Sequence, residues 1–144
     1  MVNQSKKNDP QFLERWKAVG AVGDLSDAEW ESQKREMIIH SERHYRTEGN
    51  LTDSEIEEYI RFEFRHGPRT IDEQVRRYYL MVKRGSPNRA SEMMEKASPY
   101  LDNGTRNIND VQGLCLVLYQ YLSGFLIRDG EECYTVQHNQ FRKC

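Results

Sequence analysis

The same helical pattern occurs twice in succession between residues 51 and 85, and this repeat constrains the fold more than any other feature of the chain. Each copy opens with a threonine followed three residues later by a glutamate: Thr52 with Glu55, and Thr70 with Glu73. In such a capping box, the hydroxyl and the carboxylate each accept a hydrogen bond from a free backbone N–H at the helix start. The repeat therefore predicts two helices with well-defined starts.

Both copies also end with stop signals, Gly67-Pro68 in the first and Gly85-Ser86-Pro87 in the second. Glycine readily adopts the left-handed conformation that ends a helix, and proline cannot continue the helix. Because the link between the copies is short, we expect the two helices to pack as a hairpin. Apolar residues at helical spacing predict a core-facing stripe on each helix: Ile56, Ile60 and Phe64 on the first, and Ile71, Val75, either Tyr78 or Tyr79, and Val82 on the second.

Similar signals mark two helices before the repeat. Pro10 suits the first turn of a helix that runs to about Val22. Ser26 and Glu29 form a third capping box, from which a long helix should run to about Glu48 before Gly49 stops it.

Two more helices are expected after the repeat. Pro87 starts a helix that should end at Ser98-Pro99, because proline interrupts the backbone hydrogen bonds. Asn107 or Asn109 can cap the last helix, which should run from about Ile108 to Ile127 and is apolar nearly all round.

The sequence as a whole predicts an all-α protein with a single-domain bundle of five to six helices. We expect a flexible N-terminus over residues 1–9, a helical domain over 10–130, and a tail or short strand over 131–144. The apolar helix 108–127 should lie at the centre of the bundle, surrounded by the amphipathic helices. The paired helices lack the repeat period and the Trp, Gly and Pro positions of tetratricopeptide repeats.

Composition limits the classes of function. The chain has 144 residues, of which 31% are charged, yet its net charge is only −2. This charge gives no support to a protein that binds polyanions over its whole surface, so any such site must be local.

The three cysteines, Cys115, Cys133 and Cys144, are odd in number and have no metal-binding spacing. We therefore expect a reduced, cytoplasmic protein in which Cys115 is a small core residue, while a bond between Cys133 and Cys144 remains an alternative. No basic segment followed by an apolar one opens the sequence, so we expect no secretory signal.

The uncharged run from Val111 to Ile127 has three interpretations. It is shorter than the roughly 20 apolar residues of a membrane span and contains Gln112 and Gln120, so we expect no membrane insertion. A helix buried at the centre of a bundle explains the run. A helix that is core on one side and a homodimer surface on the other explains it as well, with self-association residues Tyr119, Leu122 and Phe125.

Basic residues concentrate between residues 61 and 89, where eight Lys or Arg face only three acids. Arginine pairs with carboxylates through two parallel hydrogen bonds and stacks on aromatic rings, so this segment favours a protein-binding surface. Cations with interleaved aromatics also suit nucleic acid. The expected partner-binding residues are Arg69, Arg76, Arg77 and Arg89, and the nucleic-acid alternative adds Arg61, Arg65, Lys83, Arg84, Tyr78 and Tyr79.

A helix-turn-helix centred on Gly85 is not supported, because Arg84 and Ser91 occupy positions that this motif fills with apolar residues. Sequence-specific reading of DNA through that motif is therefore not expected.

No catalytic or metal-binding motif is found. His40 and His44 lie one helical turn apart, but Ser41 stands where the HExxH motif requires a glutamate. Glu63 and His66 form a single Glu-x-x-His, whereas a di-iron bundle requires two. Glycine-rich phosphate loops and the GxSxG motif are also missing. The sequence thus predicts a non-enzymatic binding protein without cofactor or metal. We expect this protein to bind a protein partner and to form a homodimer. Nucleic-acid binding is the alternative function.

Overall fold

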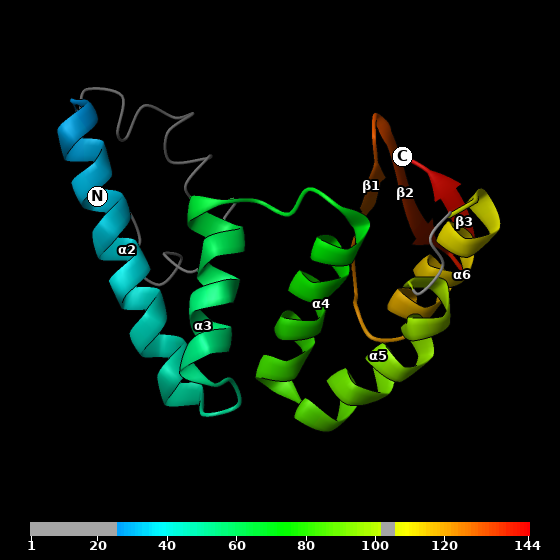
Figure 1. The fold of residues 1–144 in the computed structure, drawn as a ribbon, viewed down its shortest axis with the longest axis horizontal. Coiled ribbons are helices and arrows are strands. Elements are labelled where there is room, and N and C mark those ends of the chain that lie inside the picture. The colour runs from blue at the N-terminus through cyan, green and yellow to red at the C-terminus, as the bar shows by residue number, and fades with distance from the viewer. Residues whose placement is uncertain (1–25, 102–105) are drawn as a thin grey trace. The chain divides into compact units, whose positions relative to one another are not determined.

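The computed structural model describes residues 26–101 and 106–144, and the chain divides into two compact units between Gly67 and Pro68. The expected flexible segment 1–9 and the expected helix from Pro10 to Val22 lie outside the described residues. Figure 1 shows the described elements as coloured ribbons. The boundary lies inside the segment that the sequence predicts to be one helical hairpin.

The first unit contains two α-helices, α2 (Asp27–Glu48) and α3 (Asp53–Ile60). Both predicted capping boxes are formed, because the Ser26 and Thr52 hydroxyls accept hydrogen bonds from the backbone N–H groups three residues later. Gly49 ends α2 with a φ of 80°, in the left-handed region that the stop signal predicted.

Two aromatic rings join these helices: the centroids of Tyr45 on α2 and Tyr59 on α3 are 5.3 Å apart. At the short connection between the helices, Arg46 Nε donates to Asp53 Oδ1 over 3.1 Å. The buried apolar side chains of α2 and α3 are Met37, Ile38, Tyr45, Ile56, Tyr59 and Ile60.

A short π-helix, η2 (Arg61–Arg65), continues α3. Its winding is set by the backbone N–H of His66, which donates to the carbonyl of Arg61 five residues earlier. The helical signal up to Arg65 is confirmed, but the wider turn has no sequence motif. Phe62 and Phe64 of this segment are both buried.

The second unit has three helices: α4 (Ile71–Gly85), α5 (Pro87–Leu101) and α6 (Ile108–Tyr119). The predicted capping box of Thr70 with Glu73 is formed, and Asn107 caps α6 as expected. The prediction that α5 ends at Ser98-Pro99 is wrong, because the helix accommodates Pro99 and continues for two more residues.

The prediction that α6 extends to Ile127 is also wrong. The helix ends at Tyr119, and after an irregular segment the chain forms strand β1 (Ile127–Asp129), followed by β2 (Glu132–Gln137) and β3 (Gln140–Lys143). The protein is therefore mostly helical but not purely all-α, because a small antiparallel sheet completes it. Strands β2 and β3 occupy the segment 131–144 that was expected to be a tail or a single short strand, and β1 lies before it.

The strands form an antiparallel meander in the order β1-β2-β3. Gly130 makes the first turn possible with a φ of 64°, and His138 and Asn139 form the second with φ values of 52° and 63°. Two consecutive residues with positive φ are the hallmark of a type I′ turn, whose twist matches that of a two-stranded hairpin.

One face of the sheet completes the core of the second unit. Ile127 of β1 and Val136 of β2 are buried in the same cluster as the inward side of α6. Tyr134 stacks on Phe141 of β3, with 5.4 Å between ring centroids. The cluster also takes in residues of α4, α5 and α6: Val75, Tyr78, Met93, Ala97, Val111, Leu114, Cys115 and Leu118.

Helix α4 holds the outer edge of β1 through two side chains one turn apart. Gln74 is only 6% exposed; its Nε2 donates to the carbonyl of Arg128 over 2.8 Å, and its Oε1 accepts from the Arg128 N–H over 2.7 Å. The Tyr78 hydroxyl donates to the carbonyl of Leu126 and accepts from its N–H, over 2.9 and 3.2 Å. These contacts fix an extended backbone where the sequence favours a helix.

Cys133 of β2 and Cys144, just after β3, form a disulfide with 5.2 Å between their Cα atoms. The expectation that all three cysteines are reduced is therefore wrong, and the pairing that remained open is formed. Cys115 is the free cysteine of the described residues, and it is buried in the core as expected.

Candidate interaction surfaces

Two cations of α5 converge on one aromatic ring of the second unit. The guanidinium carbon of Arg89 is 5.2 Å from the centroid of the Tyr121 ring, and the ammonium nitrogen of Lys96 is 5.5 Å from the same centroid. Arg89 and Lys96 are seven residues apart, which places them on the same side of the helix. We refer to Arg89, Lys96 and Tyr121 as the Tyr121 cluster.

The Lys96 ammonium is held in place by its neighbours. It donates to Gln120 Oε1 over 3.2 Å and forms an ion pair with Glu92 over 3.6 Å. A hydrogen bond with Tyr121 and the nearby Glu92 carboxylate raise the pKa of Lys96, because both favour its charged form.

Arg89 differs from Lys96 in having no carboxylate partner among the described residues. Its side chain is exposed, and its contact is with the face of Tyr121. Stacking on a ring leaves the N–H groups at the edge of the guanidinium available for hydrogen bonds. The cluster therefore presents one restrained guanidinium and one ammonium beside a half-buried phenol ring.

A second ring with two cations lies on α4. The guanidinium carbon of Arg76 is 5.1 Å from the centroid of Tyr79, and the Lys83 nitrogen is 6.0 Å from it. Arg76 and Lys83 also interact with other groups of the chain, as do the neighbouring Arg77 and Arg84. These residues are consequently weaker candidates for a free surface than Arg89.

The structure does not bring the four predicted partner-binding arginines together. Arg69 precedes α4 and Arg89 follows it, so that a helix of 15 residues, about 22 Å long, separates them. Arg61 and Arg65, assigned to the nucleic-acid alternative, belong to the first unit, where both are exposed.

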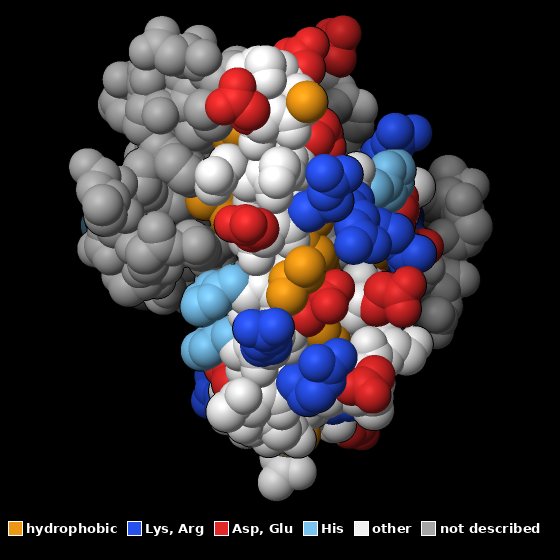
Figure 2. Space-filling view, turned by 90° about the vertical axis from the view of Figure 1, so that its left-hand side faces the viewer, with side chains coloured by type: hydrophobic (Ala, Val, Ile, Leu, Met, Phe, Trp, Pro, Cys, Tyr) orange, Lys and Arg blue, Asp and Glu red, His pale blue; other side chains and the backbone are white. Residues whose placement is uncertain are grey.

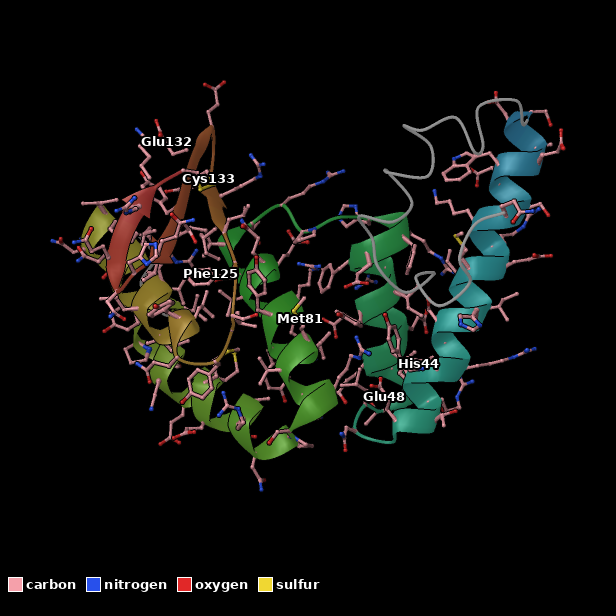
Figure 3. The ribbon with its side chains drawn as sticks, turned by 180° about the vertical axis from the view of Figure 1, so that it is seen from behind. His44, Glu48, Met81, Phe125, Glu132 and Cys133 are labelled. Atoms are coloured by element: carbon pink, nitrogen blue, oxygen red, sulfur yellow. A yellow bond between two sulfur atoms is a disulfide. The ribbon has the colours of Figure 1, made fainter. Side chains whose placement is uncertain are left out.

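The aromatic and self-association residues predicted from the sequence are buried or half-buried. Tyr78 is buried and bonded to Leu126, so it offers little ring face to a nucleic-acid base. Leu122, only 9% exposed, belongs to the core cluster. Phe125, labelled in Figure 3, packs edge-on against Tyr78 with 6.2 Å between ring centroids. Tyr119 is half-buried on α6.

Sequence reasoning did not identify Lys96, Tyr121 and Gln120 as members of a site. Lys96 lies outside the basic segment 61–89, and Tyr121 follows the next helix. The seven-residue spacing from Arg89 to Lys96 was the available signal, but it does not indicate which ring the two cations share.

The first unit offers no comparable cluster of cations on one ring among its described residues. On the face shown in Figure 2, basic and acidic side chains are interspersed, and hydrophobic side chains reach the surface only in small spots. His44 and Glu48 lie one turn apart on α2, with 3.9 Å between His44 Nε2 and Glu48 Oε2 (Figure 3). Within residues 26–101 and 106–144, no group of three or more His, Cys, Asp or Glu side chains is arranged to hold a metal ion.

None of the helices in the described ranges combines the length and the apolar character that a bilayer crossing demands. Helix α6, the most apolar, has 12 residues and measures about 18 Å, against a hydrocarbon thickness of about 30 Å. No protein-family model, curated protein or solved structure matches the chain.

Proposed function

We propose that this chain is a non-enzymatic binding protein that engages an acidic segment of a protein partner through the Tyr121 cluster. The observation that carries the proposal is the exposed Arg89 guanidinium, held 5.2 Å from the Tyr121 ring without a carboxylate partner among the described residues. Carboxylates of a partner are the groups that best complement such an arginine.

Restraint by the ring supports this proposal. An arginine that is free in solution loses side-chain entropy when a partner fixes it, and stacking on Tyr121 has already removed part of that freedom. Lys96 adds a second positive charge about two helical turns away, although Glu92 partly neutralises it. Tyrosine and arginine are also, with tryptophan, the residue types enriched among side chains that dominate binding energy.

The nucleic-acid alternative uses the same cations, with phosphates in place of carboxylates. It predicts a steep loss of affinity as the salt concentration rises, because bound cations release condensed counterions. A protein interface anchored by Arg89 and Tyr121 should respond far less to salt.

The test is a pull-down with the full chain, followed by identification of the retained protein and nucleic acid. The variant Arg89→Glu/Lys96→Glu should lose the specific protein partner, with affinity reduced by at least about thirtyfold if Arg89 is an energetic hot spot. The control Arg35→Glu, an exposed arginine of α2, makes the same kind of charge reversal in the first unit and should retain the partner.

Two results would reject the proposal. A retained set that is identical for wild type and Arg89→Glu/Lys96→Glu would show that the Tyr121 cluster is not the contact surface. Retention of RNA or DNA that is lost as salt rises, with no specific protein, would establish the nucleic-acid alternative instead.

A further inference from the structure

Helix α6 has an outer face that the core does not cover. Ile108 is 50% exposed and Leu116 is 39% exposed, and these are two of the four large hydrophobic residues classed as exposed among the described residues. Gln112 lies midway between them, and Tyr119 is half-buried at the end of the helix. The spacing of these four residues, four or three positions apart, places them on one side of α6.

This face is uncharged, which is unusual in a chain with 31% charged residues. The one charged residue of α6 is Asp110, and its carboxylate is directed to the start of the helix, where it accepts a hydrogen bond from the N–H of Asn107. By contrast, the exposed residues of α2 and α5 include both acids and bases.

We propose that the outer face of α6 binds the same face of a second copy of this chain across a two-fold axis. In such a contact both copies use the same surface patch, so a charged residue near the axis would lie against the identical charge of the other copy. The outer face of α6 has no charged side chain and is therefore free of this repulsion.

The order of residues along the face also fits self-pairing. Ile108 and Leu116 are each four residues from Gln112, in opposite directions. An antiparallel pair of α6 helices centred on Gln112 would place Ile108 of each copy against Leu116 of the other copy. The two central amides would then face each other, and each can donate and accept a hydrogen bond.

The size of the face determines the expected strength. A contact between two 12-residue helices buries less than the roughly 1,200 Å² of a standard stable interface, so association should be weak and dependent on concentration. This contact replaces the self-association residues expected from the sequence, except Tyr119. It is independent of the Tyr121 cluster and of the function proposed for it.

A charge exchange at Gln112 tests the proposal directly. Sedimentation velocity of the full oxidised chain should show a monomer–dimer equilibrium that shifts with concentration. Gln112→Glu and Gln112→Lys should each weaken dimerisation by at least about tenfold, because two like charges meet at the axis. An equal mixture of the two variants should dimerise again, because opposite charges then meet, and this recovery requires a second copy as the partner.

A matched pair of substitutions controls for loss of apolar surface. Leu116→Gln should weaken dimerisation by at least about tenfold, since each dimer loses the side chain twice. Ile39→Gln on α2 removes a similarly exposed residue, 49% exposed, and should leave dimerisation unchanged. A wild type that stays monomeric at all concentrations would overturn the proposal. So would variants that dimerise like the wild type, or a Glu and Lys mixture that remains monomeric.

Discussion

The two outer strands of the small sheet, β1 and β3, are secured by different means. Leu126 lies just before β1, and Arg128 lies within it. On the outer side of the sheet, their backbone N–H and carbonyl groups are hydrogen-bonded to Tyr78 and Gln74 of α4, respectively. Strand β3 pairs with β2 alone and is fastened to it by the disulfide from Cys144 to Cys133. One outer strand is thus stabilised by a neighbouring helix, and the other by a covalent bond.

Geometry explains why a helix can replace a neighbouring strand beside β1. Residues four apart on a helix are separated by about 6 Å along its axis, and residues two apart on a strand by about 6.6 Å. Gln74 and Tyr78 therefore match Arg128 and Leu126, whose backbone groups point the same way. No helix of the described residues supplies such side chains to β3, so the disulfide stabilises that strand.

Removal of the disulfide should have the largest effect. Cys133→Ser/Cys144→Ser opens a loop with a sequence separation of 11 residues. This should lower the free energy of unfolding by about 3 kcal/mol, because the unfolded chain regains conformational entropy. Guanidinium unfolding under non-reducing conditions measures the change. Wild type in reductant should match the variant, and a variant as stable as the oxidised wild type would contradict the role of the disulfide.

Thiol labelling provides a second check on the same bond. Burial raises the pKa of the Cys115 thiol to about 12, so at pH 8 the folded protein holds it in the neutral, unreactive form. The oxidised native protein should therefore not react with a thiol reagent at pH 8. Reductant should expose Cys133 and Cys144, while Cys115 reacts only after unfolding. Rapid labelling of Cys115 in the folded state would contradict its burial.

The second largest effect is expected at β1. Gln74→Leu keeps the volume of the side chain but leaves the N–H and carbonyl of Arg128 without their partners, which should cost about 2 kcal/mol. Hydrogen exchange measures where the structure opens: the Arg128 amide should lose protection. The Cys144 amide, bonded to the Cys133 carbonyl over 2.8 Å, should keep its protection. Equal loss at both amides would mean that the two outer strands are not held independently.

A smaller effect should follow from Tyr78→Phe. This change removes only the hydroxyl that bonds to the backbone of Leu126, and we expect a loss of about 1 kcal/mol in chemical denaturation. Tyr79→Phe is the matched control, because Tyr79 is the adjacent half-buried tyrosine, and it should change stability by no more than a few tenths of a kcal/mol. If both variants change the free energy of unfolding by a similar amount, the hydroxyl of Tyr78 does not stabilise β1.

The smallest effect is expected at the turn before β3. His138 has a φ of 52°, which carries a steric cost that glycine avoids. Since glycine also loses more entropy on folding, His138→Gly should raise stability by only about 0.5 kcal/mol, seen as a higher Tm in thermal denaturation. A lower Tm would show that the imidazole makes a stabilising contact that outweighs the backbone strain.

The features that the sequence predicted correctly are local. The capping boxes at Ser26, Thr52 and Thr70 each depend on residues three positions apart, and all three are formed. The extended backbone at Leu126 and Arg128 is bonded instead to residues of α4 that lie 48 and 54 positions away along the chain. Those contacts hold an apolar segment in an extended conformation. Periodicity and propensity do not include such distant contacts, and they therefore predicted a helix there.

The same distinction applies to the candidate surfaces. Arg89 was identified because it lies in a segment rich in arginine, but its ring partner Tyr121 is 32 residues further along the chain (121 minus 89) and comes close only through the packing of α5 and α6. The apolar character of α6 was recognised from the sequence. Which of its apolar side chains face outward was settled by the burial of Val111, Leu114 and Cys115 on the inward side.

The hydrogen bonds from Gln74 to Arg128 also limit how copies of this chain can aggregate. Open-ended polymerisation into a fibril requires two free strand edges per molecule, one to receive the previous copy and one to template the next. Helix α4 occupies the edge at β1, so among the strands of the described residues β3 has the one edge that can recruit another copy. Edge-to-edge growth of the folded chain through this sheet would therefore stop after one addition, because the side chains of α4 block the second edge.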